Sequence, residues 1–144
     1  MKILVIALGI VFAVFVGLVA YVRLVDLPTA QFHQIPREKP AGRHAGKTSF
    51  YVVIDVAPGT GPDQLAQFVK VIADTPSTRL LAGTPDDGHV SFVHRSKIWG
   101  FPDITNIALV GDQLRLRSAA RFGGSDHGVN RDRIERWLKA LGQL

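Results

Sequence analysis

The sequence predicts an α+β protein in which a transmembrane helix precedes one small two-layer domain. Three observations support this prediction: an uncharged apolar run at residues 3–22, several short segments rich in β-branched and aromatic residues, and two amphipathic segments. After the transmembrane helix we expect the order β-α-β-β-β-β-α, with a mainly antiparallel sheet packed on both helices in a helix-grip-like arrangement. A chain of 144 residues leaves room for one domain beside the N-terminal segment.

The apolar run at residues 3–22 has the length of a membrane span. At about 1.5 Å of rise per residue it covers roughly 30 Å, the hydrocarbon thickness of a bilayer. A cleaved signal peptide is the alternative, because Lys2 supplies a short positive region. The apolar core of a signal peptide is, however, only about 7–15 residues long and precedes a small-x-small cleavage site. This run is longer and ends in Tyr21-Val22-Arg23, so we expect residues 1–23 to be an uncleaved anchor.

The orientation of this anchor has two interpretations. Lys2 precedes the apolar run, whereas Arg23, Arg37, Lys39 and Arg43 follow it, and a count of Lys and Arg alone places the domain in the cytoplasm. A very short N-terminal tail, however, behaves like a signal anchor, and large domains translocate largely regardless of charge. We therefore expect a single-pass membrane protein whose domain is periplasmic or otherwise extracytoplasmic.

Residues 24–47 have the Pro- and Gly-rich, charged composition of a linker, and residues 48–144 form the domain. Residues 1–47 hold six basic and two acidic residues, whereas residues 48–144 hold eleven basic and ten acidic residues. A nucleic-acid-binding module concentrates positive charge on its folded domain, so we expect no nucleic acid partner. The basic linker either contacts anionic lipid headgroups or is a solvated tether.

Short segments with strand or helix periodicity fill the domain. Strands are expected at residues 48–56, 78–82, 89–98, 104–110 and 113–121, and helices at residues 61–75 and 129–141. Thr84-Pro85-Asp86-Asp87-Gly88 has the composition of a hairpin turn. His94 shares a strand face with apolar residues, so we interpret it as a hydrogen-bonded core or boundary residue. The last strand has a basic face, which should be solvated or meet an acidic partner; it carries Arg115, Arg117 and Arg121.

The most distinctive stretch runs from the last strand into the last helix and reads R-S-A-A-R-F-G-G-S-D-H-G-V-N-R at residues 117–131. With Arg95-Ser96 and Gly100-Phe101-Pro102-Asp103, it resembles the bacterial and plastid domain-of-unknown-function family 1499, whose members carry a similar R-S-x-S-R-x-G-x-S-D-x-G-V-N run. The resemblance covers residues 49–141 and implies the fold, without an established activity. Many relatives also carry a C-P-x-S-P-N-C-V-S-like segment. This chain has no Cys, which excludes disulfides, thiolate catalysis and Cys-based metal sites.

Two interpretations of the distinctive stretch remain open. In the first, amides at the N-terminus of the last helix and arginine guanidinium groups bind a phosphate or carboxylate. The candidate anion-binding residues are Arg121, Gly123, Gly124, Ser125, Asp126, Asn130 and Arg131. In the second, Ser125 or Asn130 caps the helix while Asp126 pairs internally with an arginine.

Catalytic chemistry has weaker support in the sequence. Ser125, Asp126 and His127 are the residue types of a hydrolase triad, but three consecutive residues cannot align as nucleophile, base and orienting group. An enzyme hypothesis would use a wider polar set: Ser96, Asp103, Arg121, Ser125, Asp126 and His127. No His or carboxylate spacing indicates a metal, and we expect no cofactor. Trp99, Phe101 and Trp137 either line a ligand pocket or pack between the sheet and the last helix.

These features favour a membrane-anchored, non-enzymatic envelope module that binds a lipid, a small anionic ligand or a partner protein. Two alternatives stay open: an enzyme that uses the 121–131 loop, and a structural or assembly module.

Overall fold

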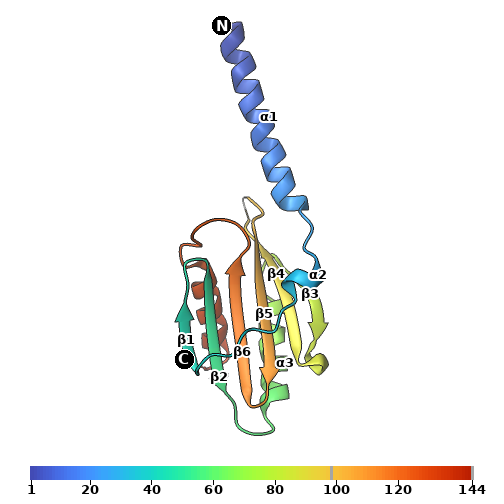
Figure 1. The fold of residues 1–144 in the computed structure, drawn as a ribbon, viewed down its shortest axis with the longest axis vertical. Coiled ribbons are helices and arrows are strands. Elements are labelled where there is room, and N and C mark those ends of the chain that lie inside the picture. The colour runs from blue at the N-terminus through green and yellow to red at the C-terminus, as the bar shows by residue number, and fades with distance from the viewer. Residues whose placement is uncertain (98, 144) are drawn as a thin grey trace.

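A computed structural model describes residues 1–97 and 99–143 and contains a long N-terminal helix followed by a sheet with helices on one face (Figure 1). The helices are α1 (Lys2–Leu24), α2 (Thr29–Phe32), α3 (Gly61–Ala73) and α4 (Val129–Ala140), with a 3₁₀ turn, η1, at Pro85–Asp87. The strands are β1 (Gly42–Ala45), β2 (Ser49–Asp55), β3 (Thr78–Thr84), β4 (His89–Arg95), β5 (Pro102–Val110) and β6 (Gln113–Ala120).

The six strands form one antiparallel sheet in the order β1-β2-β6-β5-β4-β3. From β2 onward the chain follows the predicted order of strands and helices, which confirms the α+β fold. The expected hairpin is also present, because Thr84 and Asp87 form a capping box around η1 and Gly88 takes the left-handed conformation with φ of 71°. The N-terminal segment therefore adds one strand, β1, to the predicted five.

Strand β1 comes from the segment that the sequence analysis assigned to the linker. It pairs with β2 from Gly42 opposite Val53 to Ala45 opposite Phe50, and the amide of Gly46 donates to the carbonyl of Ser49 at the turn. The sequence Gly-Arg-His-Ala has no strand periodicity, so only the pairing with β2 makes it a strand. The domain boundary at residue 48 stays a prediction.

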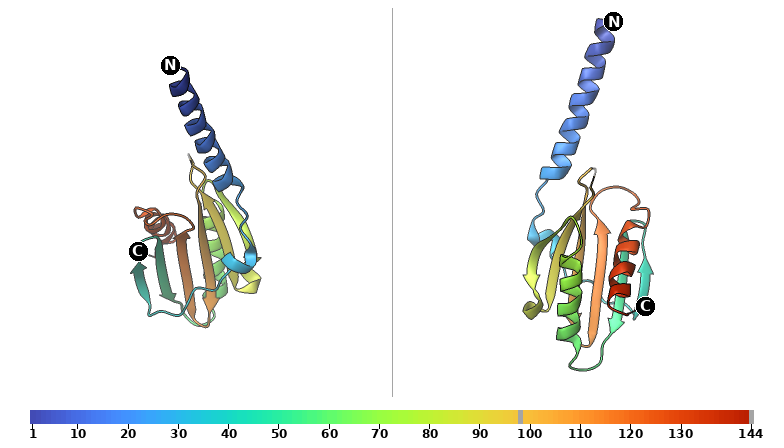
Figure 2. Two further views of the ribbon diagram at one scale, coloured as in Figure 1. Left: turned by 45° about the horizontal axis from the view of Figure 1, so that its top comes forward. Right: turned by 180° about the vertical axis from the view of Figure 1, so that it is seen from behind.

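Helices α3 and α4 cover one face of the sheet, which we call the helix face (Figure 2). Its core combines inward residues of β2, β4, β5 and β6 with the apolar stripes of both helices; the largest members are Phe50, Leu65, Phe68, Ile72, Phe92, Ile107, Leu116, Ile134, Trp137 and Leu138. All of these side chains are buried. The space between sheet and C-terminal helix is thus a packed core, a question that the sequence had left open.

The opposite face of the sheet, which we call the linker face, is crossed by residues 27–39 (Figure 1). Leu27 packs with Val93 and Ile104 at one end of this segment. Further along, the carbonyl of Phe32 accepts a hydrogen bond from Asn106 Nδ2 at 3.1 Å, and the hydroxyl of Tyr51 donates to the carbonyl of Arg37. The segment is therefore attached to the sheet as a strap, and we use that name for residues 27–39.

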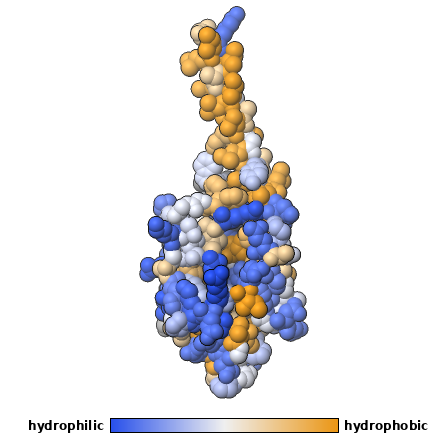
Figure 3. Space-filling model, viewed as in Figure 1, coloured by the Kyte–Doolittle hydropathy of each residue, from blue (hydrophilic) through white to orange (hydrophobic). Residues whose placement is uncertain are grey.

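Helix α1 extends away from the domain and exposes apolar side chains (Figure 3). In the described part of the chain it is the one helix long and apolar enough to cross a membrane, by length and composition. Near its C-terminal end Val22 is buried against the domain. Helix α1 therefore ends directly on the domain.

Candidate functional site

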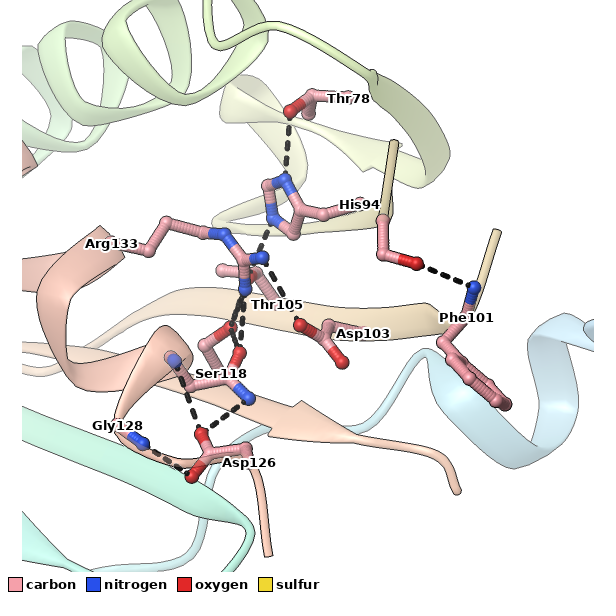
Figure 4. Close-up of polar contacts among 11 residues, drawn as sticks. Thr78, His94, Phe101, Asp103, Thr105, Ser118, Asp126, Gly128 and Arg133 are labelled. Carbon is pink, nitrogen blue, oxygen red and sulfur yellow. Dashed lines mark hydrogen bonds and ion pairs between the residues drawn. The ribbon is translucent and has the colours of Figure 1, made fainter. Parts of the chain in front are cut away.

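Ser118 and Asn130 of the distinctive C-terminal stretch belong to a buried polar chain beneath α4 (Figure 4). His94 Nδ1 lies 2.7 Å from the hydroxyl of Thr78, and its Nε2 lies 2.8 Å from that of Thr105. Thr105 is 2.8 Å from Ser118, whose hydroxyl donates to Asn130 Oδ1 at 2.5 Å. The chain joins four elements, β3, β4, β5 and β6, to α4.

The order of donors and acceptors along this buried polar chain fixes the tautomer of His94. Because Asn130 Oδ1 can only accept, Ser118 donates to it, and Thr105 must then donate to Ser118. Nε2 of His94 consequently carries the proton and donates to Thr105, while Nδ1 accepts from Thr78. Burial, with a smaller contribution from Arg133, lowers the pKa of His94 to about 3, which keeps the imidazole neutral as this pattern requires.

Arg133 of α4 joins the chain to a buried ion pair. Its Nη1 donates to Asn130 Oδ1 at 2.6 Å, and its Nη2 donates to Asp103 Oδ2 at 3.1 Å. The side chains of Arg133 and Asp103 are only 11% and 15% exposed. Burial raises the pKa of Asp103, although the positive charge of Arg133 opposes that shift. This ion pair therefore fastens α4 to strand β5.

Asp126 caps the N-terminus of α4. Its carboxylate accepts from the amides of Gly128 at 3.2 Å and Asn130 at 3.1 Å, and from Asn130 Nδ2 at 2.8 Å. Burial acts to raise the pKa of Asp126, but these hydrogen bonds outweigh it and lower the pKa. The backbone amides that the anion hypothesis would offer to a ligand thus already donate hydrogen bonds to the carboxylate of Asp126.

The other members of the predicted anion set lie in different surroundings. Gly123, Gly124, Ser125 and Arg131 are exposed. Arg121 lies on the linker face, where its guanidinium donates to the carbonyl of Asp26 at 2.5 Å and stacks 4.9 Å from the centre of the Phe32 ring. The structure therefore separates Arg121 from Asp126 and Asn130.

The three aromatic candidates also have different neighbours. Trp137 lies in the core and donates from Nε1 to Thr75 Oγ1 at 2.8 Å. Trp99 instead contacts Phe15 of α1. Phe101 packs against Phe122, with ring centres 6.3 Å apart. Trp137 thus has the packing role between sheet and helix, whereas Trp99 and Phe101 belong to the surface near α1.

The polar residues of the enzyme hypothesis are engaged in local contacts. Ser96 Oγ accepts from the amide of Phe101 at 3.0 Å, and Ser125 Oγ accepts from the amide of His127 at 3.2 Å. Asp103 and Asp126 hold Arg133 and the α4 amides, as described above. Each of these groups therefore has a structural hydrogen bond in this fold, and the enzyme hypothesis gains no geometric support from them.

A groove of about 830 Å³ lies on the linker face, between the strap and strands β1, β2, β5 and β6. Its walls combine apolar and aromatic side chains with amides and cations; among them are Phe32, Ile35, Tyr51, Ile104, Asn106 and Ala119. Figure 3 views this face, where hydrophilic side chains predominate around smaller apolar areas. The volume of this groove lies within the range of small-molecule sites.

The groove is positively charged. Arg37 and Lys39 contribute from the strap, and Arg117 and Arg121 contribute from β6 and the turn after it. Lys39 Nζ lies 5.5 Å from the centre of the Tyr51 ring. None of the described residues that line the groove is Asp or Glu. The basic face predicted for the last strand is therefore covered by a segment that adds further positive charge.

Arg115 lies buried under the strap on the same face of β6 as Arg117. Within the described residues its guanidinium donates to neutral oxygens at long range, those of Pro36 at 3.5 Å and Gln113 at 3.4 Å. Its buried Nε has no hydrogen-bond partner within the described residues. A buried cation without a carboxylate strengthens the positive potential of this face.

Two stacked imidazoles fasten the strap near its start. The rings of His33 and His89 lie 3.9 Å apart and nearly parallel. His33 Nδ1 is 2.6 Å from Ser91 Oγ, and His89 Nε2 is 3.1 Å from Asn106 Oδ1. Burial lowers the pKa of His89. The hydrogen bond with Asn106 opposes this shift, whereas the neighbouring His33 adds to it. The groove wall is therefore held by hydrogen-bonded groups.

Sequence reasoning found Arg121 and the basic face of β6 but missed the groove, because it treated residues 24–47 as a tether. The cations Arg115 and Arg117 on one face of a strand predict only that this face is solvated or meets a polar partner, and no periodicity in residues 24–47 identifies that segment as its cover.

The comparisons with known proteins agree with the resemblance seen in the sequence. No curated protein matches the chain. The model of a protein family of unknown function, DUF1499, matches residues 37–141, which run from the end of the strap to just beyond α4. The matched region includes β1 and all residues of the buried polar chain. The protein therefore belongs to the DUF1499 family.

Proposed function

We propose that this protein is a single-pass membrane-anchored binding module whose groove on the linker face takes an anionic ligand with an apolar part. The observation that carries the proposal is the composition of the groove: cations on two sides, aromatic and aliphatic walls, and no carboxylate among the described residues that line it. A phosphate or carboxylate group fits such a set, because arginine donates paired hydrogen bonds to these groups.

The apolar part of the ligand is favoured by the groove walls. Ile35 is exposed and Phe32 is half-buried, and both would remain partly wetted if the groove held only a small inorganic anion. Anchoring by α1 would keep the groove close to a source of anionic amphiphiles, the bilayer itself. We propose that the domain lies on the extracytoplasmic side of the membrane, since large domains translocate largely regardless of the positive charges beside the span.

The first test is native mass spectrometry of the full-length protein extracted from its own membrane in mild detergent. We expect a stoichiometric anionic adduct. An adduct that partitions into organic solvent is a lipid, and one that stays in water is a small anion. A protein that arrives empty, and that takes up neither dodecyl phosphate nor inorganic phosphate when these are added, would contradict the proposal.

Two double variants with equal loss of charge sharpen this test. Arg117→Gln with Lys39→Gln removes two cations from the groove, whereas Arg131→Gln with Lys139→Gln removes two exposed cations from α4. We expect the first variant to bind dodecyl phosphate roughly tenfold more weakly, which corresponds to about 1.4 kcal/mol. The second should bind like the natural chain; equal weakening of both would indicate attraction by net charge alone.

A further inference from the structure

The base of α1 is fastened to the connection between β4 and β5. Arg95, the last residue of β4, donates from Nη1 both to the carbonyl of Val22 in α1 and to the carbonyl of Gly100, each at 3.0 Å. Gly100 has φ of 75°, and a Cβ there would lie 2.6 Å from the side chain of Arg23. The close approach of these segments keeps the connection beside the helix.

One face of α1 continues this contact away from the domain. Phe15, Val19 and Val22 are four and three residues apart and therefore share a helix face. Val22 is buried, Val19 is partly buried, and Phe15 packs edge-on against Trp99 with ring centres 5.5 Å apart. Trp99 thus reaches along α1 beyond the helix end.

The position of Phe15 sets the depth of Trp99. Phe15 precedes Arg23 by eight residues, which corresponds to about 12 Å along the helix axis. If residues 3–22 cross a bilayer, Phe15 lies inside its apolar layer, and a side chain that touches Phe15 must enter at least the interfacial layer. The geometry that links Trp99 to α1 is therefore incompatible with a domain held clear of the membrane.

The surface around Trp99 has the composition of a membrane contact. Trp99 is 44% exposed and Phe101 is 40% exposed, although both are large apolar residues. Lys97 of the same connection is exposed. Arg23 of α1 lies beside Gly100 of that connection. Aromatic rings flanked by Lys and Arg are the residues that occupy membrane–water interfaces.

We infer that Trp99 and Phe101 form a second membrane contact, which inserts into the interfacial layer of the bilayer that α1 crosses and seats the domain on the membrane surface. The occupant of this apolar surface is lipid, because the surface is continuous with the lipid-facing side of α1. The inference rests on the anchoring role of α1 that is part of the proposed function, and it is independent of any ligand in the groove.

Because the chain has no Cys, single cysteines give unique positions for a fluorescent probe. The test uses the full-length protein in phosphatidylcholine–phosphatidylglycerol vesicles, with an environment-sensitive nitrobenzoxadiazole probe at Trp99→Cys, Leu8→Cys or Asp112→Cys. Leu8 lies in α1, and Asp112 lies in the β5–β6 turn at the opposite end of β5. Lipids carrying a quencher report contact between each probe and the bilayer.

We expect several-fold stronger quenching at position 99 than at position 112, with a blue-shifted emission, and strong quenching at position 8. Quenching at position 8 together with an aqueous, unquenched probe at position 99 would overturn the membrane contact while leaving the anchor intact. An unquenched probe at position 8 would overturn the anchor and the contact together.

A second measurement uses the native side chains, since Trp99 and Trp137 are the two tryptophans and Trp137 is buried in the core. Brominated lipids should quench part of the emission of the natural chain, and the quenched part should fall several-fold in Trp99→Phe, which keeps an aromatic ring. Equal quenching of both proteins would overturn the inference.

Discussion

The two faces of the sheet are built in different ways. On the helix face, polar groups that interrupt the apolar core are satisfied by one another: the chain from Thr78 to Asp126 closes on the α4 amides, and Arg133 meets Asp103. On the linker face, the cations Arg115 and Arg117 have no carboxylate within ion-pair distance in the described part of the protein. The buried cation of the helix face, Arg133, is thus paired with a carboxylate, whereas Arg115 and Arg117 of the linker face have no such partner among the described residues.

This difference is the reason for proposing the linker face as the binding face. A satisfied polar network stabilises one arrangement of strands and helix, because removing any member leaves a buried group without a partner. An unbalanced set of cations contributes little to stability and keeps its capacity for an external anion. The distinctive C-terminal stretch therefore serves mainly the fold, and the less conspicuous strap builds the groove.

The largest expected effect is on the helix face. Arg133→Gln leaves the buried carboxylate of Asp103 unpaired and should lower the free energy of unfolding by roughly 3–5 kcal/mol. Arg43→Gln breaks the exposed pair with Glu135, whose side chains are 47% and 27% exposed, and should cost less than about 1 kcal/mol. Urea unfolding of the full chain in detergent, followed by tryptophan fluorescence, measures both; equal losses would refute the contrast between these two ion pairs.

The next effect follows pH. Because the pKa of His94 falls from its usual 6.5 to about 3 in the folded protein, the unfolded chain binds more protons between those values. The contribution of His94 is complete above about pH 6.5 and should decrease by roughly 1.4 kcal/mol per pH unit below it. Unfolding curves between pH 7 and pH 5 measure this slope. His94→Gln, which can keep hydrogen bonds without titrating, should flatten it; an unchanged slope would assign the effect to other groups.

A smaller effect is expected at the strap. Tyr51→Phe removes the hydroxyl that donates to the carbonyl of Arg37 and should cost roughly 0.5–1.5 kcal/mol. Hydrogen exchange should become faster in residues 27–39 and stay unchanged in α4. Tyr21→Phe, in the exposed part of α1, is the control and should alter neither. Faster exchange in α4 as well would mean that the two faces unfold together.

The smallest effect on stability is expected in the groove. Arg117→Gln with Lys39→Gln should change the free energy of unfolding by no more than about 0.5 kcal/mol, because both side chains are exposed and make no ion pair among the described residues. The same urea titration measures it. A loss of several kcal/mol would show that these cations support the fold, and would weaken the case for a site kept free for a ligand.

The periodicity of apolar residues predicted the helices and strands whose side chains pack in the core or form the long apolar helix. It found α1, α3, α4 and the five main strands, and it placed His94 on the core face. The buried polar chain was only partly foreseen, through Asp126 and Asn130. Its other members, Thr105 and Ser118, are small hydroxyl residues at inward positions near the same end of neighbouring strands, and only strand register brings them together.

The strap could not be predicted because several of its hydrogen bonds to the sheet are made by its backbone. The carbonyls of Phe32, Pro36 and Arg37 and the amide of Gln34 bind side chains of the sheet. Any residue type supplies these groups, so no periodicity in the sequence encodes them. The groove was missed for the same reason, since one of its walls is the strap.

Strand β1 also protects the edge of the sheet from aggregation. It is a short, exposed strand with an arginine at its centre, and it lies outside β2, whose residues Phe50, Tyr51, Val52 and Val53 are buried. Short charged edge strands are a protection against pairing with other molecules. A chain cut at residue 48 would lose β1 and leave β2 paired only with β6, so that the other backbone edge of an apolar strand would be exposed to edge-to-edge aggregation. The segment that contains β1 thus also protects the edge of the sheet.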